Sequence, residues 1–147
     1  MDKVTVFKEL AEHLKDKINE ALDHIDGLKN SRDGDTKSSA GDKYETSREM
    51  VQQEIDRAEA RLQQLKRQLN ELNNFKGENN EHCESGALVL LEKVSLLLGP
   101  AIGKVIIQGE PLLCISMGSP IGQLLNGKKE GDKIQFNGKE QLIHKVL

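Results

Sequence analysis

Residues 7–28 read FKELAEHLKDKINEALDHIDGL, and residues 51–72 read VQQEIDRAEARLQQLKRQLNEL. Both stretches place an apolar residue alternately every four and every three positions, which is the heptad pattern of a helix that packs along one stripe. The stripe residues are Phe7, Ala11, Leu14, Ile18, Ala21, Ile25 and Leu28, and then Val51, Ile55, Ala58, Leu62, Leu65, Leu69 and Leu72. The pattern predicts two long amphipathic helices.

The two stripes match each other in reverse order. If the chain folds back on itself, Leu28 lies opposite Val51, every later pair keeps the same register, and the fold-back centre falls at Ser39 and Ala40. A short connection makes such a pairing cheap in entropy. We therefore expect an intramolecular antiparallel hairpin in a monomer, about 40 Å long, rather than a coiled coil that dimerises.

The connection between the helices, residues 31–42, reads SRDGDTKSSAGD and is rich in residues that form turns. Its carboxylates, with one just beyond it, are Asp33, Asp35, Asp42 and Glu45. Carboxylates clustered on an exposed end can hold a hard cation such as Mg²⁺, particularly when another protein supplies the remaining ligands. Asp42 and Glu45 could instead form a capping box, and Asp33 and Asp35 could form Asx turns. Asp35 lies within the break and has the stronger functional case.

A polar linker, residues 77–84, separates the hairpin of residues 1–76 from a globular domain of residues 85–147. Short apolar runs at 87–91, 94–98, 104–107 and 112–116 predict strands of an antiparallel sheet. Residues 119–127 predict one short helix, with Ser119 as N-cap and Pro120 at the first position. The predicted fold class is therefore α+β.

The end of the chain predicts a closing hairpin of residues 133–136 and 140–146 around Asn137 and Gly138. A three-residue loop with a bulge is preferred over a strict two-residue turn, because it keeps the apolar alternation on one face. The longer loop would place Leu142, His144 and Val146 on the same face of the hairpin as Phe136. His144 is then expected to be a satisfied edge or core histidine.

Composition limits the function classes. The chain is 31% charged and 3% aromatic with a net charge of −3, and it contains no strongly basic half that would attract nucleic acid. Cys83 and Cys114 lack paired spacing, so we expect neither a zinc site nor a disulfide, and a reduced cytoplasmic setting. No signal-peptide pattern, membrane span or nucleophile motif is apparent.

The order of several motifs resembles the bacterial GreA/GreB transcription elongation factors. The hairpin carries GDTK at residues 34–37, then Tyr44 and the Arg48-Glu49 pair. The globular part carries ISMGSPIG at residues 115–122 and GKKEGD at residues 127–132. The likeness covers nearly the whole chain, and the second pair of motifs is the more specific part.

The resemblance implies an FKBP-like C-terminal domain that docks on bacterial RNA polymerase, with the hairpin entering the secondary channel. It implies polymerase-binding residues Ser119, Pro120, Ile121 and Gly122. Tip carboxylates would help the polymerase hold its Mg²⁺, and the candidates are Asp35, Asp33, Asp42 and Glu45. Candidates for contact with the nascent RNA of a backtracked complex are Lys29, Arg32, Lys37, Lys43 and Arg48. The protein would have no cofactor of its own and would not be an enzyme by itself.

One departure from the family concerns the tip, which in the family has the form Asp-x-x-Glu. The third residue after Asp35 is Ser38, and two extra residues precede the second helix. A neighbouring carboxylate could replace the missing one. Alternatively, the protein regulates polymerase from the channel without stimulating cleavage. An FKBP-type chaperone or prolyl isomerase and a coiled-coil scaffold outside transcription are the remaining alternatives.

Overall fold

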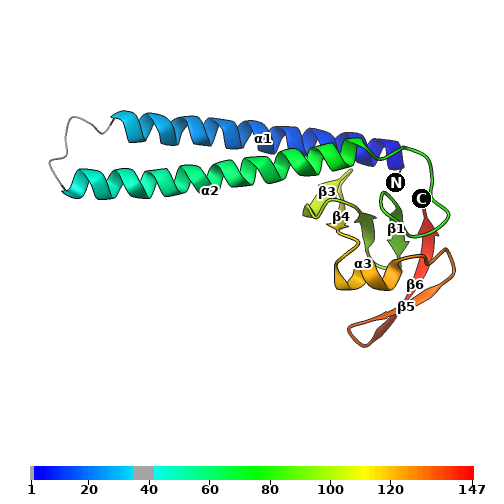
Figure 1. Ribbon diagram of the computed structural model, residues 1–147. Coiled ribbons are helices and arrows are strands. Elements are labelled where there is room, and N and C mark those ends of the chain that lie inside the picture. Colours follow the sequence, from blue (N-terminus) through cyan, green and yellow to red (C-terminus); the bar gives the residue numbers. More distant parts are fainter. Residues whose placement is uncertain (1, 35–41) are drawn as a thin grey trace. The chain divides into compact units, whose positions relative to one another are not determined.

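The computed structural model describes residues 2–34 and 42–147 and confirms the α+β class (Figure 1). The chain divides into two compact units, one of Met1–Glu12 with Gln68–Leu147 and one of His13–Arg67. The elements are α1 (Lys3–Gly34), α2 (Asp42–Asn73), β1 (Leu88–Leu91), β2 (Ser95–Leu98), β3 (Gly103–Ile107), β4 (Glu110–Ile115), α3 (Pro120–Leu125), β5 (Lys133–Phe136) and β6 (Lys139–Val146).

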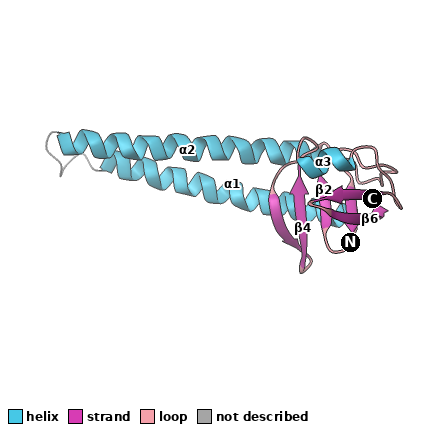
Figure 2. Ribbon diagram, turned by 90° about the horizontal axis from the view of Figure 1, so that it is seen from below, coloured by secondary structure: helices cyan, strands magenta, loops and turns pink. Residues whose placement is uncertain are grey.

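Helices α1 and α2 lie side by side and antiparallel, as Figures 1 and 2 both show. Every residue of the two predicted stripes is buried or half-buried, while most positions between them are exposed. The best-buried stripe residues of the His13–Arg67 unit are Leu14, Ile25, Ile55, Leu62 and Leu65. The heptad prediction is confirmed. Apolar side chains at this spacing lie along one stripe of each helix, and they are removed from water where the two stripes meet.

The connection between these helices is shorter than predicted. Residues 31–34 form the last turn of α1, and α2 begins at Asp42. Arg32 favours this extension, since a cation in the last turn interacts well with the helix dipole. The predicted fold-back centre at Ser39 and Ala40 lies outside the described residues.

The sheet has the strand order β3-β4-β2-β1-β6-β5 and is mixed rather than antiparallel. Strands β2 and β4 pair in parallel, with Ser95 opposite Leu112. The reason is the tight β3–β4 hairpin, whose turn residues Gln108 and Gly109 have φ values of 53° and 80°. It places β3 at the edge and returns β4 alongside β2 in the same direction.

The closing hairpin also corrects the prediction. Phe136 pairs directly with Lys139, so the turn has two residues, Asn137 at φ 52° and Gly138 at φ 75°. Both residues adopt the left-handed backbone that a primed turn requires. The irregularity lies instead where β6 pairs with β1, between Leu90 and Leu91.

This irregularity decides which side chains of β6 enter the core. Ile143 and Val146 are both buried although they are three residues apart, which a regular strand would place on opposite faces. His144 is exposed and Leu142 is half-buried. The predicted common face of Leu142, His144 and Val146 was therefore wrong.

One face of the sheet packs against α3, which runs beside the strands in Figure 2. Its core includes Val89, Leu96, Leu98, Leu125 and Ile143. The opposite face of the sheet carries side chains that are all at most 1% exposed. By strand alternation these are Leu88, Leu97, Leu112 and Cys114. Within the same unit, the buried apolar side chains at the helix ends are Val6, Leu10 and Leu72, and we infer that they cover this second face.

Both cysteines are buried and free. Burial raises the pKa of Cys83 to about 11 and that of Cys114 to about 12, so both remain thiols at neutral pH.

Gln68 is a buried polar residue of α2 with an incomplete set of hydrogen bonds. Its Nε2 donates to the carbonyl of Ala101 at 3.2 Å, but no described residue donates to its Oε1. An unsatisfied buried acceptor costs more than one neutral hydrogen bond contributes. We expect Gln68→Met to raise the free energy of unfolding by about 1 kcal/mol in urea denaturation. Exposed Gln63→Met is the control, and a loss of stability in Gln68→Met would contradict this account.

Candidate functional site

Arg32 organises the end of the helical hairpin. Its Nε and Nη2 donate to the two carboxylate oxygens of Asp33 at 3.0 and 3.3 Å. Its Nη1 donates to Oε1 of Gln52 on α2 at 2.7 Å, and Nε2 of Gln52 donates to Asp56 at 3.0 Å. This predicted RNA-contact residue therefore already joins both helices.

Asp33 is the predicted tip carboxylate whose surroundings are best defined. The hydrogen bonds from Arg32 hold the pKa of Asp33 below its ordinary value, and the charges of Arg48 and Lys29 act in the same direction. The carboxylate therefore stays ionised, and its pairing with Arg32 is lost only as pH falls through that lowered pKa. Both carboxylate oxygens are directed to Arg32, which makes Asp33 a weaker candidate for holding a metal.

The start of α2 carries the other described tip residues. Glu45 is exposed and borders a shallow pocket of about 280 Å³ with Arg48, Glu49 and Gln52. Nη1 of Arg48 donates to the hydroxyl of Tyr44 at 2.9 Å. Lys43 is exposed and belongs to the same turn as Glu45.

Lys29 is the predicted RNA-contact residue that forms an ion pair between the two helices. Its Nζ lies 3.5 Å from Glu59 on α2, and both side chains are about half exposed, so the pair is open to screening by salt.

Several predicted site residues lie outside the described part of the chain. These are Asp35, Lys37 and Ser38, together with the side chain of Asp42. Among the described residues, no group of three or more His, Cys, Asp and Glu side chains could hold a metal ion.

The predicted polymerase-binding residues form the beginning of α3. Ser119 is the N-cap: its Oγ accepts from the Gly122 amide at 3.1 Å and donates to the Ser116 carbonyl at 2.7 Å. Gly122 is buried, and a Cβ there would lie 2.3 Å from the Ser116 carbonyl oxygen. Ser119 and Gly122 therefore have structural reasons to be present, whereas Pro120 is exposed and Ile121 is half-buried against the core.

The sequence did not predict the further residues that lie beside Arg32 at the end of the hairpin and beside Ser119 at the start of α3. Gln52 and Asp56 hold Arg32 in position, and the available signal was their i, i+4 spacing on one helix face. One turn after Pro120, Leu124 is 40% exposed, which makes it an exposed apolar side chain of α3. The helical pattern alone could not tell that Leu125 rather than Leu124 enters the core.

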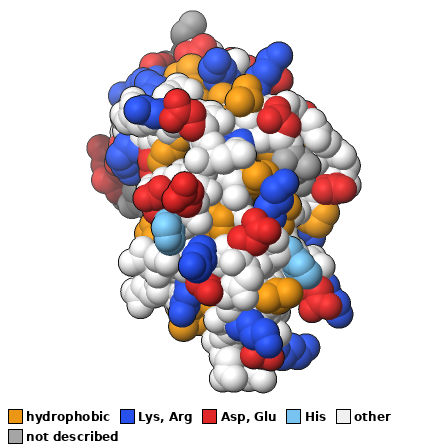
Figure 3. All heavy atoms as spheres, turned by 90° about the vertical axis from the view of Figure 1, so that its right-hand side faces the viewer, with side chains coloured by type: hydrophobic (Ala, Val, Ile, Leu, Met, Phe, Trp, Pro, Cys, Tyr) orange, Lys and Arg blue, Asp and Glu red, His pale blue; other side chains and the backbone are white. Residues whose placement is uncertain are grey.

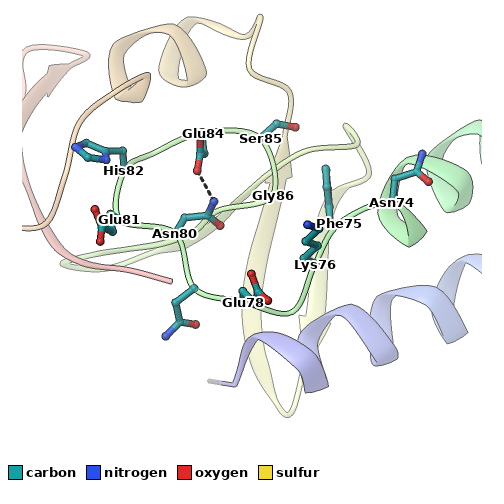
Figure 4. Close-up of a pocket in the computed structure, with 11 residues that line it drawn as sticks. Asn74, Phe75, Lys76, Glu78, Asn80, Glu81, His82, Glu84, Ser85 and Gly86 are labelled. Atoms are coloured by element: carbon teal, nitrogen blue, oxygen red, sulfur yellow. Dashed lines mark hydrogen bonds between the residues drawn. The ribbon is translucent and has the colours of Figure 1, made fainter.

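A polar pocket of about 590 Å³ lies within the loop of residues 74–86 (Figure 4). The close-up shows Asn80 and Glu84 pointing toward one another, and Nδ2 of Asn80 donates to Glu84 at 2.6 Å. Oδ1 of Asn80 accepts from Nζ of Lys3, which also donates to the Glu78 carbonyl at 2.7 Å. Burial lowers the pKa of Lys3. Since these groups pair with one another, we assign the loop a structural role.

The face of the molecule in Figure 3 carries acidic and basic side chains interspersed with uncharged surface. This agrees with the net charge of −3 and with the absence of a basic half in the sequence. Among the helices that the structure describes, none is long and apolar enough to cross a membrane.

A solved structure is similar to this chain. No family model matches the chain, and no curated protein matches it. Among solved structures, the chain is similar to one titled "Structure of the transcription factor Gfh1", with 22% sequence identity over 92% of this chain and 92% of that chain. The TM-score of this match is 0.37.

Proposed function

We propose that the protein binds bacterial RNA polymerase as a transcription elongation factor and stimulates the cleavage of backtracked RNA with the end of its α1–α2 hairpin. The observation that carries this proposal is the combination of two features in one chain. An antiparallel hairpin has a connection that carries the carboxylate of Asp35, and the motif at residues 115–122 builds the capped start of α3. This is the order of parts that the sequence resemblance implies.

The proposed chemistry assigns the carboxylates unequal roles. Asp35 helps the polymerase hold a Mg²⁺ ion and orient the attacking water, and Glu45, which is exposed at the start of α2, is the next candidate. Asp33 is directed to Arg32 and contributes mainly by pairing with it. The metal belongs to the polymerase, and this chain contributes only oxygen ligands.

A cleavage assay tests the proposal directly. Purified elongation complexes that have backtracked are incubated with Mg²⁺, with and without the protein, and the labelled RNA is separated by length. We expect shortened RNA to appear faster when the protein is present. Binding to the same complexes is measured in parallel by co-migration.

A second function fits two observations. Ser38 stands where the family has its glutamate, and Asp33 pairs with Arg32. A channel-binding regulator would bind polymerase and alter elongation or initiation without new short RNA, even at high Mg²⁺. A protein that binds no polymerase would instead fit a scaffold, and turnover of an Xaa-Pro peptide would identify a prolyl isomerase.

A further inference from the structure

The Arg32 side chain connects the two helices through a hydrogen bond that is more sheltered than the described ion pair between the helices, Lys29–Glu59. It is only 20% exposed, although Asp33 beside it is 59% exposed. The Lys29–Glu59 pair, by contrast, is about half exposed on both sides and spans 3.5 Å. Arg32 therefore sits in the more sheltered contact between α1 and α2.

The guanidinium group is held from two directions. Nε and Nη2 form a fork on Asp33, in the same helix, while Nη1 donates across to Gln52 at 2.7 Å. A planar guanidinium cannot rotate to improve one of these contacts without weakening another. The bond to Asp33 therefore orients the group that reaches Gln52.

Gln52 is oriented as well. Its Nε2 donates to Asp56 one turn further along α2, at 3.0 Å, which leaves Oε1 facing Arg32. The four side chains Asp33, Arg32, Gln52 and Asp56 thus form one continuous chain of hydrogen bonds across the hairpin. Connected polar groups of this kind are worth more than separate exposed ion pairs.

We propose that Arg32 is a positioning residue: together with Gln52 it clamps the last turn of α1 to α2 and so sets the separation of the two helix ends that flank Asp35 in the sequence. Its effect on RNA cleavage rests on the proposed function. The clamp itself is a property of the free protein and can be tested there.

The free-protein test measures the distance between the helix ends. Spin labels are attached to cysteines introduced at exposed Asn30 and Ser47, and the buried native thiols react slowly by comparison. We expect Arg32→Met and Gln52→Met each to broaden the distance distribution, and the double variant to broaden it no further than either single one. Lysine cannot reproduce the fork, so Arg32→Lys should not restore the narrow distribution.

The matched control is another arginine–glutamine pair of the same hairpin. Nη1 of Arg61 donates to Gln64 at 2.9 Å, but both residues lie on α2. Arg61→Met and Gln64→Met therefore remove the same type of bond without unlinking the helices, and they should leave the distribution unchanged. Equal distributions in Arg32→Met, Gln52→Met and the unsubstituted protein would overturn the clamp.

The cleavage assay tests the consequence. We expect Arg32→Met to lower the maximal cleavage rate by about 10- to 100-fold, as misplacement of reacting groups does, at an unchanged half-saturating protein concentration. Full cleavage with a broadened distribution would overturn the positioning role. If the unsubstituted protein stimulates no cleavage, the proposed function fails, while the distance measurement still decides whether the clamp exists.

Discussion

Gly122→Ala is expected to lower the free energy of unfolding of the unit that contains the sheet, Met1–Glu12 with Gln68–Leu147, by about 3 kcal/mol. The added Cβ would lie 2.3 Å from the Ser116 carbonyl oxygen and 2.9 Å from that of Met117. Both oxygens belong to the backbone, so no side-chain rotation relieves the collision. The same turn holds the Ser119 cap, and moving it would also break the hydrogen bonds of that cap.

Gly118→Ala is the matched control for this substitution. Gly118 lies in the same turn, and a Cβ there would meet nothing within 4 Å. Urea denaturation of the two variants should therefore separate clearly, with Gly118→Ala close to the unsubstituted protein. Equal midpoints for Gly122→Ala and Gly118→Ala would show that the turn is looser than described.

Gly122 is a poor position for testing whether the start of α3 binds polymerase. Loss of binding in Gly122→Ala would report a damaged turn rather than a lost contact. The exposed side chain of Pro120 is the better probe, because its removal leaves the Ser119 cap and the core in place.

Asp35→Asn is expected to reduce stimulated RNA cleavage by at least about tenfold while polymerase binding stays unchanged. Loss of an outer-sphere partner of a catalytic metal typically costs 10- to 100-fold, and loss of a direct ligand should cost no less. Asparagine keeps the size of the side chain but removes the negative charge that a hard cation prefers. The single-turnover rate of RNA shortening, measured over a range of Mg²⁺ concentrations, gives the size of the effect.

Asp26→Asn controls for the loss of one negative charge from the hairpin. Asp26 is exposed on α1, two turns before the end of that helix. It should leave both cleavage and its Mg²⁺ dependence unchanged, whereas high Mg²⁺ should partly restore the Asp35→Asn rate. An Asp35→Asn variant with full activity would remove Asp35 from the proposed chemistry and direct attention to Glu45.

Local features of this chain could be predicted because they depend on neighbours in sequence. The apolar stripes repeat at helical spacing, and both became the buried line of the hairpin. Ser119 and Pro120 similarly predicted the capped start of α3, since a cap involves residues within one turn.

Features that depend on distant residues could not be predicted in the same way. The apolar alternation of β6 predicts an irregularity at the turn of Asn137 and Gly138. The irregularity lies instead in the pairing of β6 with β1, a strand distant in the sequence. The parallel pairing of β2 with β4 likewise depends on where the β3–β4 hairpin places its strands. The hydrogen bond from Arg32 to Gln52 could not be predicted either, because it joins residues twenty positions apart.

The sequence alone therefore determined the two helices, their antiparallel pairing and the polar character of their connection. Periodic burial of apolar side chains is a local and strongly repeated constraint, so no other part of the chain is needed to specify it. Only the tertiary structure decided that the predicted break begins with a helical turn and that Arg32 of this turn donates a hydrogen bond to Gln52 of α2. A hydrogen bond between polar side chains depends on the exact distance and angle across two elements, and no spacing in the sequence encodes that geometry.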